Sequence, residues 1–289
     1  MTTITMPPPR IGRVALSVAD LERSIRFYEE TVGLTLLGRD GEMARMGAGD
    51  ETFLLLHGQP GARPVQRATG LYHFAILVPS RLALARTLNH LLQTDAPISG
   101  FADHHVSEAI YLTDPDGHGI EIYRDRPREE WDYRGGQVKM GTDPIDLQGI
   151  LRELEGQPSL PPRMVPGTFV GHVHLQVAHI AATEQFYTGP LGLDLVLRYG
   201  PRATFMSANG YHHHLGANTW AGENLMPAPE DAARLLWYEI VLSDAAAVDA
   251  TAQALSDAGH EIERGDNAFW VVDPSGIRVL ITNEEAPAS

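Results

Sequence analysis

The sequence predicts an α+β fold built from four copies of one module, in which a strand and a helix are followed by several strands. Two repeats carry this prediction. Residues 11–34 (IGRVALSVADLERSIRFYEETVGL) and 170–193 (VGHVHLQVAHIAATEQFYTGPLGL) align without a gap at an offset of 159 residues. The same offset relates residues 112–125 (LTDPDGHGIEIYRD) to 271–284 (VVDPSGIRVLITNE). One constant offset along the chain indicates a tandem duplication.

Each half of the duplication divides again into two modules. Residues 11–34 and 170–193 both open with an alternating apolar run typical of a strand, continue as a helix to a Phe-Tyr pair, and close at a glycine. Two further strand-then-helix openings are LYHFAILVPSRLALARTLNHLL (71–92) and LWYEIVLSDAAAVDATAQAL (236–255). We therefore expect modules 1 to 4, in chain order, at about 11–60, 70–125, 168–220 and 233–283.

The modules form two halves with a linker between them. The first half is expected at residues 8–128, the linker at 129–167 and the second half at 168–284. The linker contains GQPSLPPRMVPG (156–167), whose proline and glycine residues favour an irregular connection, after a short helix expected at 143–154. A chain of 289 residues can form two domains, each with its own core.

The composition narrows the classes of function. Apolar residues make up 43% and charged residues 20% of the chain, which is typical of a globular protein, and a net charge of -15 disfavours nucleic acid as a partner. No segment approaches the ~20 apolar residues of a membrane-spanning helix. The start MTTITMPPPR lacks the features of a secretory signal, so we expect a cytoplasmic location and no membrane partner. The chain has no cysteine, so a metal must bind to nitrogen and oxygen ligands.

Four segments identify a family resemblance. They are TGLYHFAILVPSR (69–81), VSEAIYLTDPDGHGIEIYRDRPR (106–128), GHVHLQV (171–177) and GYHHHLGANTWAG (210–222). Together they resemble the vicinal oxygen chelate superfamily, which includes glyoxalases, antibiotic-binding proteins and extradiol dioxygenases, and within it the two-domain bacterial catechol 2,3-dioxygenase type. The resemblance covers nearly the whole chain outside the linker and tails. It implies four βαβββ modules that pair into two domains.

The resemblance also implies metal ligands at the third residue of a module's first strand and within its last strand. The residues at these positions are Arg13, His73, Glu121, His172, Trp237 and Leu280. Of these, His73, His172 and Glu121 can bind a metal, and two histidines with one carboxylate suit non-haem Fe²⁺, with Mn²⁺ as the alternative. Because these ligands belong to modules 2 and 3, we expect those modules to pair, within one chain or between two chains, and module 1 to pair with module 4.

Three residues around the metal are implied by the same resemblance. His213, in the run of three histidines, matches an acid–base histidine, and imidazole suits proton transfer because its free pKa is ~6.5. Tyr111 matches an active-site tyrosine. His104 matches a histidine that contacts the substrate, and its neighbour His105 is the alternative because the local lengths differ.

Further histidines are weaker candidates for contact with substrate, namely His174, His105, His212 and His214. His174 follows His172 by two residues, so both lie on one strand face. We expect the tract 212–214 on a strand, where neighbours alternate, so His212 and His214 face away from His213 and serve packing or hydrogen bonding. A surface or metal-scavenging histidine tract is the alternative interpretation.

The remaining histidines match no position of the family. His118 lies in the turn DPDGHG and is expected to face solvent. No role is assigned to His57, His90, His179 or His260.

The activity implied by the resemblance is extradiol ring cleavage, in which O₂ is inserted into catechol or a substituted catechol next to the diol. The partners are then a small aromatic diol and O₂, and a homo-oligomer is expected from the family. One alternative is a glyoxalase-like metal-dependent isomerase or lyase, although ATFMSANGYHHH (203–214) of module 3 lacks the second carboxylate that such enzymes usually use. The other is a metal-free binding protein for a small molecule such as an antibiotic, which needs no metal ligands in register.

Overall fold

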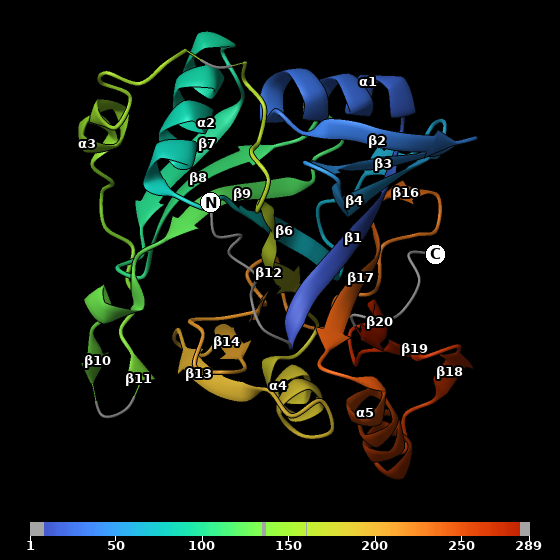
Figure 1. Cartoon of the computed structure of the whole chain (residues 1–289). Helices are drawn as coiled ribbons and strands as arrows, with labels where there is room; N and C mark the ends of the chain where they lie inside the picture. The colour runs from blue at the N-terminus through green and yellow to red at the C-terminus, as the bar shows by residue number, and fades with distance from the viewer. Residues whose placement is uncertain (1–8, 135–136, 160, 284–289) are drawn as a thin grey trace.

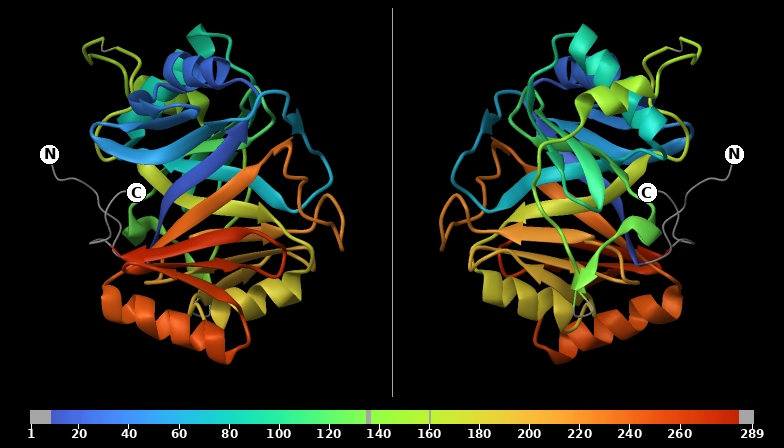
Figure 2. Two further views of the ribbon diagram at one scale, coloured as in Figure 1. Left: turned by 90° about the vertical axis from the view of Figure 1, so that its right-hand side faces the viewer. Right: turned by 90° about the vertical axis from the view of Figure 1, so that its left-hand side faces the viewer.

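The computed structural model describes residues 9–134, 137–159 and 161–283. The ends predicted for the two halves, residues 8 and 284, and the N-terminal segment MTTITMPP lie outside these ranges, so the boundaries of the halves stay a prediction. Two eight-stranded sheets form the middle of the molecule, with helices at both ends (Figures 1 and 2). No helix in the described ranges is long and apolar enough to cross a membrane.

The first sheet joins module 1 to module 4. Its strand order is β18-β19-β20-β17-β1-β4-β3-β2, with β1 and β17 antiparallel at the centre. Module 1 supplies β1 (Arg10–Val18), β2 (Thr35–Asp40), β3 (Met43–Ala48) and β4 (Glu51–Gly58). Module 4 supplies β17 (Leu235–Leu242), β18 (Ile262–Gly265), β19 (Ala268–Val272) and β20 (Arg278–Asn283).

The second sheet joins module 2 to module 3 in the order β13-β14-β15-β12-β6-β9-β8-β7. Module 2 supplies β6 (Gly70–Leu77), β7 (Ile98–Asp103), β8 (Ser107–Thr113) and β9 (Gly119–Asp125). Module 3 supplies β12 (Phe169–Gln176), β13 (Asp194–Arg198), β14 (Ala203–Ser207) and β15 (Leu215–Asn218). The predicted fold class and module pairing are confirmed, and the pairing occurs within one chain.

The helix of each module follows its first strand. These helices are α1 (Leu21–Arg26), which continues as a π-helix (Phe27–Val32), α2 (Arg81–Gln93), α4 (Ile180–Thr188) and α5 (Ala245–Asp257). Asp20, Ser80 and Asp244 cap α1, α2 and α5 by accepting a hydrogen bond from a first-turn backbone N–H. Figure 2 shows α1 and α2 at one end of the molecule and α4 and α5 at the other. Each half of the chain therefore forms one helical end, while each sheet takes one module from each half.

A buried tyrosine–aspartate hydrogen bond recurs at the duplicated turns. The Tyr28 hydroxyl donates to Oδ2 of Asp114 (3.0 Å), and the Tyr187 hydroxyl donates to Oδ2 of Asp273 (3.1 Å). Each bond joins neighbouring modules that belong to different sheets. The tyrosine of each Phe-Tyr pair and the aspartate of the Asp-Pro turn therefore link the two sheets.

The prediction that His118 faces solvent is wrong. His118 is buried, and its Nε2 lies 3.0 Å from the carbonyl oxygen of Ser17 in β1, to which it donates. The turn is also closed from within, because Oδ1 of Asp114 accepts the backbone N–H groups of Asp116 (2.9 Å) and His118 (2.8 Å). A turn at the end of one sheet is buried here because the other sheet covers it.

The linker and connections carry short elements. They are β5 (Arg63–Pro64), a 3₁₀-helix (Arg128–Glu130), β10 (Tyr133–Arg134), β11 (Gln137–Val138), α3 (Leu147–Arg152) and β16 (Ala232–Ala233). Strand β5 pairs with β16, and β10 pairs with β11. The helix expected at 143–154 is confirmed by α3.

The second sheet has apolar side chains on both faces. Phe74, Ile76 and Val173 belong to the main core, which extends under the helices. Side chains alternate along a strand, so the neighbours of Phe74 and Ile76 on β6 face the other way. There they form a smaller group, which we name the cup cluster, made of Ala75, Leu77, Ala109, Tyr123 and Phe169.

Candidate metal centre

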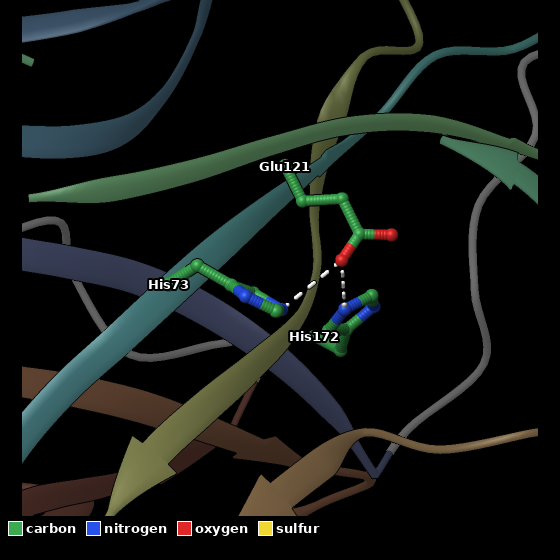
Figure 3. Close-up of side chains that lie close together, drawn as sticks. All are labelled: His73, Glu121 and His172. Atoms are coloured by element: carbon green, nitrogen blue, oxygen red, sulfur yellow. Dashed lines mark hydrogen bonds and ion pairs between the residues drawn. The ribbon is translucent and has the colours of Figure 1, made fainter. Parts of the chain in front are cut away.

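Three side chains from adjacent strands converge on one another (Figure 3). Strand β6 carries His73 and lies between β12, which carries His172, and β9, which carries Glu121. Ala75 of β6 lies opposite both His172 and Glu121 in the strand register. Since His73 is two residues from Ala75, all of these side chains project from one face of the sheet. Alternation along strands and the pairing of β6 with both β12 and β9 thus bring His73, His172 and Glu121 together.

The centre is compact and buried. Oε2 of Glu121 lies 3.0 Å from Nε2 of His73 and 3.2 Å from Nε2 of His172. The exposed fractions are 7% for His73, 2% for Glu121 and 1% for His172. The candidate ligand atoms all lie within 4.8 Å of one another, and within the described residues no other group of His, Asp and Glu meets this condition.

Burial and mutual charge set the protonation of the centre. Burial raises the pKa of Glu121, but interactions with His172 and His73 lower it by more, and the net pKa lies well below its usual value. Burial lowers the pKa of His172 to about 4, against the opposing effect of Glu121. An ionised carboxylate beside a neutral imidazole is the state that metal ligands require.

The residues fit a divalent cation. The buried carboxylate accepts a hydrogen bond from Nε2 of His172 (3.2 Å). Nε2 of His73 is buried without a hydrogen-bond partner among the described residues, although it lies 3.0 Å from Oε2 of Glu121, and Nδ1 of His172 also lacks one. An uncompensated buried charge and an unpaired buried nitrogen are costly, and a cation bound to two nitrogens and one oxygen would satisfy both.

Tyr111 and His104 lie next to this centre. Tyr111 is directly opposite Glu121 in the β8–β9 register, and its ring lies 5.7 Å from that of His73. His104 donates from Nδ1 to the carbonyl of Gly141 (2.7 Å), so its Nε2 accepts the Tyr111 hydroxyl (2.6 Å). Burial, reinforced by Glu121, raises the pKa of Tyr111 well above its usual value, so the hydroxyl stays protonated.

His105 points away from Tyr111. It adopts a left-handed backbone conformation (φ 71°), and its Nε2 lies 2.7 Å from Oδ2 of Asp143. Of the two neighbouring histidines, the structure brings His104 rather than His105 to the centre.

The expectation that the tract 212–214 lies on a strand is wrong. Strand β14 ends at Ser207 and β15 begins at Leu215, so the three histidines occupy the connecting loop. Asn209 and Gly210 both have positive φ (56° and 64°), which turns the chain before the histidines. The ring of His213 lies 4.1 Å from that of His172.

The three histidines of the loop have separate surroundings. The side chain of His213 is partly buried, and burial, together with the neighbouring His172 and His212, lowers its pKa well below the usual value. His212 lies between Nδ1 of His213 and Oδ1 of Asp125, at 2.8 Å from each. His214 accepts the backbone N–H of Ala208 at Nδ1 (3.2 Å). The loop thus brings His212 against His213, so the expectation that His212 faces away from His213 is wrong.

His174 lies on the same face as His172 but outside the ligand group. It is opposite His73 in the β6–β12 register, with ring centroids 5.0 Å apart. Its Nε2 accepts a hydrogen bond from the side chain of Asn218 (3.0 Å). Burial and the nearby histidines lower its pKa well below the usual value, so it is a neutral neighbour of the centre.

Two residues of β9 near the centre were not singled out from the sequence. Tyr123 and Asp125 follow Glu121 by two and four residues, so strand alternation puts them on its face. The ring of Tyr123 lies 4.8 Å from that of His172, and Asp125 binds His212. Extending the alternation from Glu121 along GIEIYRD would have found both.

Comparison with known proteins agrees with this architecture. The family model for the Glyoxalase/Bleomycin resistance protein/Dioxygenase superfamily matches residues 10–122 and 169–281. The Catechol-2,3-dioxygenase of Bacillus subtilis (strain 168) is 43% identical over 271 residues, which make up 91% of this chain and 93% of that protein.

Solved structures show the same fold at low sequence identity. A crystal structure from Bacillus subtilis subsp. subtilis str. 168 superposes with a TM-score of 0.67 at 13% identity, covering 98% of this chain and 87% of that chain. Glyoxalase I from Zea mays superposes with a TM-score of 0.58 at 18% identity, and the match covers 95% of this chain and 92% of that chain. With the family match over both halves and the 43% identical relative, the chain belongs to the Glyoxalase/Bleomycin resistance protein/Dioxygenase superfamily.

Proposed function

We propose that this chain is an extradiol ring-cleaving dioxygenase, which inserts O₂ into catechol or a substituted catechol next to the diol. The observation that carries the proposal is the convergence of His73, Glu121 and His172 in a chain that is 43% identical, over 91% of its length, to a catechol-2,3-dioxygenase. Two histidines and one carboxylate are the ligand set of non-haem iron oxygenases, so we assign Fe²⁺ to the centre, with Mn²⁺ as the alternative.

Fe²⁺ held by these ligands supplies Lewis acidity toward the diol and a path for electrons to O₂. We assign the Tyr111 hydroxyl to a hydrogen bond with the diol, in which its oxygen accepts, and His104 to the same part of the site, where it holds that hydroxyl. Two observations support these assignments: the 2.6 Å hydrogen bond between Tyr111 and His104, and the position of Tyr111 opposite Glu121 in the strand register. We assign His213 to proton transfer, because its ring lies 4.1 Å from that of the candidate ligand His172 and a neutral imidazole has a lone pair that can accept a proton.

We assign the cup cluster to the aromatic ring of the substrate. Its members include the small side chains Ala75 and Ala109 and the larger Leu77 and Phe169, all buried. An apolar wall beside charged ligands admits an aromatic ring and excludes water, which strengthens the electrostatic interactions within the site.

Oxygen consumption tests the proposal. Purified protein is reconstituted with Fe²⁺ without oxygen and then assayed in an oxygen electrode with a panel of catechols, with a parallel sample reconstituted with Mn²⁺. We expect oxygen uptake and a yellow ring-opened product with the iron sample. Turnover without oxygen uptake would favour the isomerase alternative, and protein that binds no metal would favour the metal-free binding protein. Either result contradicts the proposal.

Three further expectations stay predictions. They are a cytoplasmic location, a homo-oligomeric state, and the absence of nucleic-acid and membrane partners. The net charge of -15 supports the exclusion of nucleic acid.

A further inference from the structure

A continuous hydrogen-bond chain runs from Asp125 to His213. Oδ1 of Asp125 lies 2.8 Å from Nε2 of His212, and Nδ1 of His212 lies 2.8 Å from Nδ1 of His213. The ring of His213 lies 4.1 Å from that of His172, one of the candidate ligands. These hydrogen bonds therefore link a carboxylate at the end of β9, through two imidazoles, to the edge of the candidate metal centre.

This series of hydrogen bonds determines which nitrogen of each imidazole carries the hydrogen. A carboxylate oxygen accepts, so Nε2–H of His212 donates to Asp125. Nδ1 of a neutral His212 then has a lone pair, so the donor between the two rings is Nδ1–H of His213. Nε2 of a neutral His213 is left without a hydrogen, and it is the nitrogen that can accept a proton.

Neighbouring aromatic side chains fix Asp125 and His212 in place. The Tyr211 hydroxyl donates to Oδ2 of Asp125 (2.9 Å), and the Tyr123 hydroxyl lies 2.8 Å from that of Tyr211. His212 is 1% exposed, and its ring centroid lies 4.0 Å from that of Tyr211 and 5.4 Å from that of Trp131. A ring packed on two sides and hydrogen-bonded at both nitrogens keeps one orientation.

We propose that Asp125 and His212 are positioning residues for His213, which orient its ring and hold it as the Nδ1–H tautomer with Nε2 free. The catalytic consequence rests on the proposed function, in which His213 accepts the proton of the diol. Without Asp125, His212 can take the opposite tautomer and donate from Nδ1. The hydrogen of His213 then moves to Nε2, and the acceptor is lost. The aspartate of a Ser-His-Asp triad holds one histidine in this way.

The pair His105 and Asp143 provides a matched control. Nε2 of His105 lies 2.7 Å from Oδ2 of Asp143, so the chemistry and length are close to those of His212 and Asp125. The Asp143 side chain is 66% exposed. Asp143→Leu therefore tests the loss of a histidine–carboxylate pair that does not lead to His213.

Nuclear magnetic resonance tests the tautomer directly. Two-bond ¹H–¹⁵N correlation spectra of ¹⁵N-histidine-labelled protein, loaded with diamagnetic Zn²⁺, distinguish Nδ1–H from Nε2–H, and His213→Phe assigns the signals. We expect the Nδ1–H form of His213 in the wild type and in Asp143→Leu, and its loss or a mixture in Asp125→Leu. His212→Phe, which keeps a ring in place, serves if Asp125→Leu does not fold. An Nε2–H form in the wild type, or an unchanged Asp125→Leu spectrum, overturns the proposal.

Turnover of the iron-loaded enzyme tests the consequence. We expect Asp125→Leu to lower kcat for catechol by about 10–100-fold, with KM and bound iron within ~2-fold. In the His213→Phe background the same substitution should change kcat by less than ~2-fold, because it acts through His213. An equal loss in both backgrounds overturns the proposal. A wild type that consumes no oxygen but shows the Nδ1–H form contradicts the proposed function and supports the positioning of His213.

Discussion

Glu121 in the second sheet and Glu239 in the first are both buried carboxylates, and they are compensated in opposite ways. In the second sheet, Oε2 of Glu121 lies 3.0 and 3.2 Å from two imidazole nitrogens. In the first sheet, the guanidinium of Arg13 donates to Glu239 from Nε to Oε2 at 2.8 Å and from Nη2 to Oε1 at 2.9 Å. Arg13 stands at the position of His172 in the duplication, at the offset of 159 residues.

The difference shows how one scaffold can carry either a candidate metal centre or a closed ion pair. A guanidinium keeps its charge and cannot bind a metal, so Arg13 neutralises Glu239 permanently. Thr282 also donates to Oε1 of Glu239 (3.0 Å), which leaves that carboxylate well hydrogen-bonded. At Glu121 the neighbouring groups are imidazoles, whose nitrogens can offer lone pairs to a cation. A duplicated position therefore becomes a metal site only where its donors can be neutral.

The largest expected effect comes from removing the carboxylate of the metal centre. Glu121→Ala should lose more than nine tenths of the bound metal and lower oxygen uptake with catechol by about 10³-fold, because a ligand of the proposed iron is gone. Metal content is measured by mass spectrometry and uptake by oxygen electrode. Leu280→Met changes the equivalent position of the first sheet and should leave both unchanged. Wild-type metal content in Glu121→Ala would remove the distinction between the sheets.

The next largest effect is on stability and belongs to the first sheet. Arg13→Met should lower the free energy of unfolding by about 3 kcal/mol, because it leaves the buried Glu239 without its cation. Bound metal should stay at the wild-type level. The matched control is Arg278→Met, which breaks an exposed pair with Glu263 on the same sheet and should cost less than ~1 kcal/mol. Urea unfolding measures the loss of stability in both variants. Equal losses in Arg13→Met and Arg278→Met would contradict the role of the buried pair.

A smaller effect on activity is expected from the hydroxyl next to the centre. Tyr111→Phe should lower kcat/KM by roughly 10-fold with bound iron unchanged, because one hydrogen bond to the diol and to His104 is lost. His105→Gln changes the histidine that points away and should keep wild-type kinetics. The same loss in both variants would contradict the assignment of His104 over His105.

The smallest effect concerns the acid dependence of stability. Burial raises the pKa of Glu239, but Arg13 lowers it by more, so its folded-state pKa lies below the unfolded value of ~4.3. Its contribution to stability is therefore complete above that unfolded value and is lost as pH falls through the folded-state pKa. In metal-free protein, the unfolding free energy of Glu239→Gln should decline less over this acidic range than that of the wild type. If the unfolding free energies of Glu239→Gln and the wild type fell equally with pH, a lowered pKa of Glu239 would be contradicted.

Much of the architecture could be predicted because its signals are local. Strand alternation, the helices after each first strand and the duplicated Asp-Pro turns all appear in short segments, and the ligand types followed from the family resemblance. The predictions that were wrong concern the tertiary surroundings of individual histidines. His118 was expected in solvent but lies under β1, because no local pattern shows which sheet end another sheet covers. The tract 212–214 was expected on a strand, but a turn at Asn209 and Gly210 precedes it.

By itself, the sequence determined four modules and the side chains able to bind a metal, since the alternation of side chains along a strand and the hydrogen bonds within a helix follow the order of residues. Only the tertiary structure decided which donors meet. His172 reaches Glu121 across 51 positions and Arg13 reaches Glu239 across 226, through strand pairings between the two halves. The orientation of His213 likewise depends on Asp125, a residue of another module. Electrostatic compensation depends on distance in space, and distance in space is set by packing.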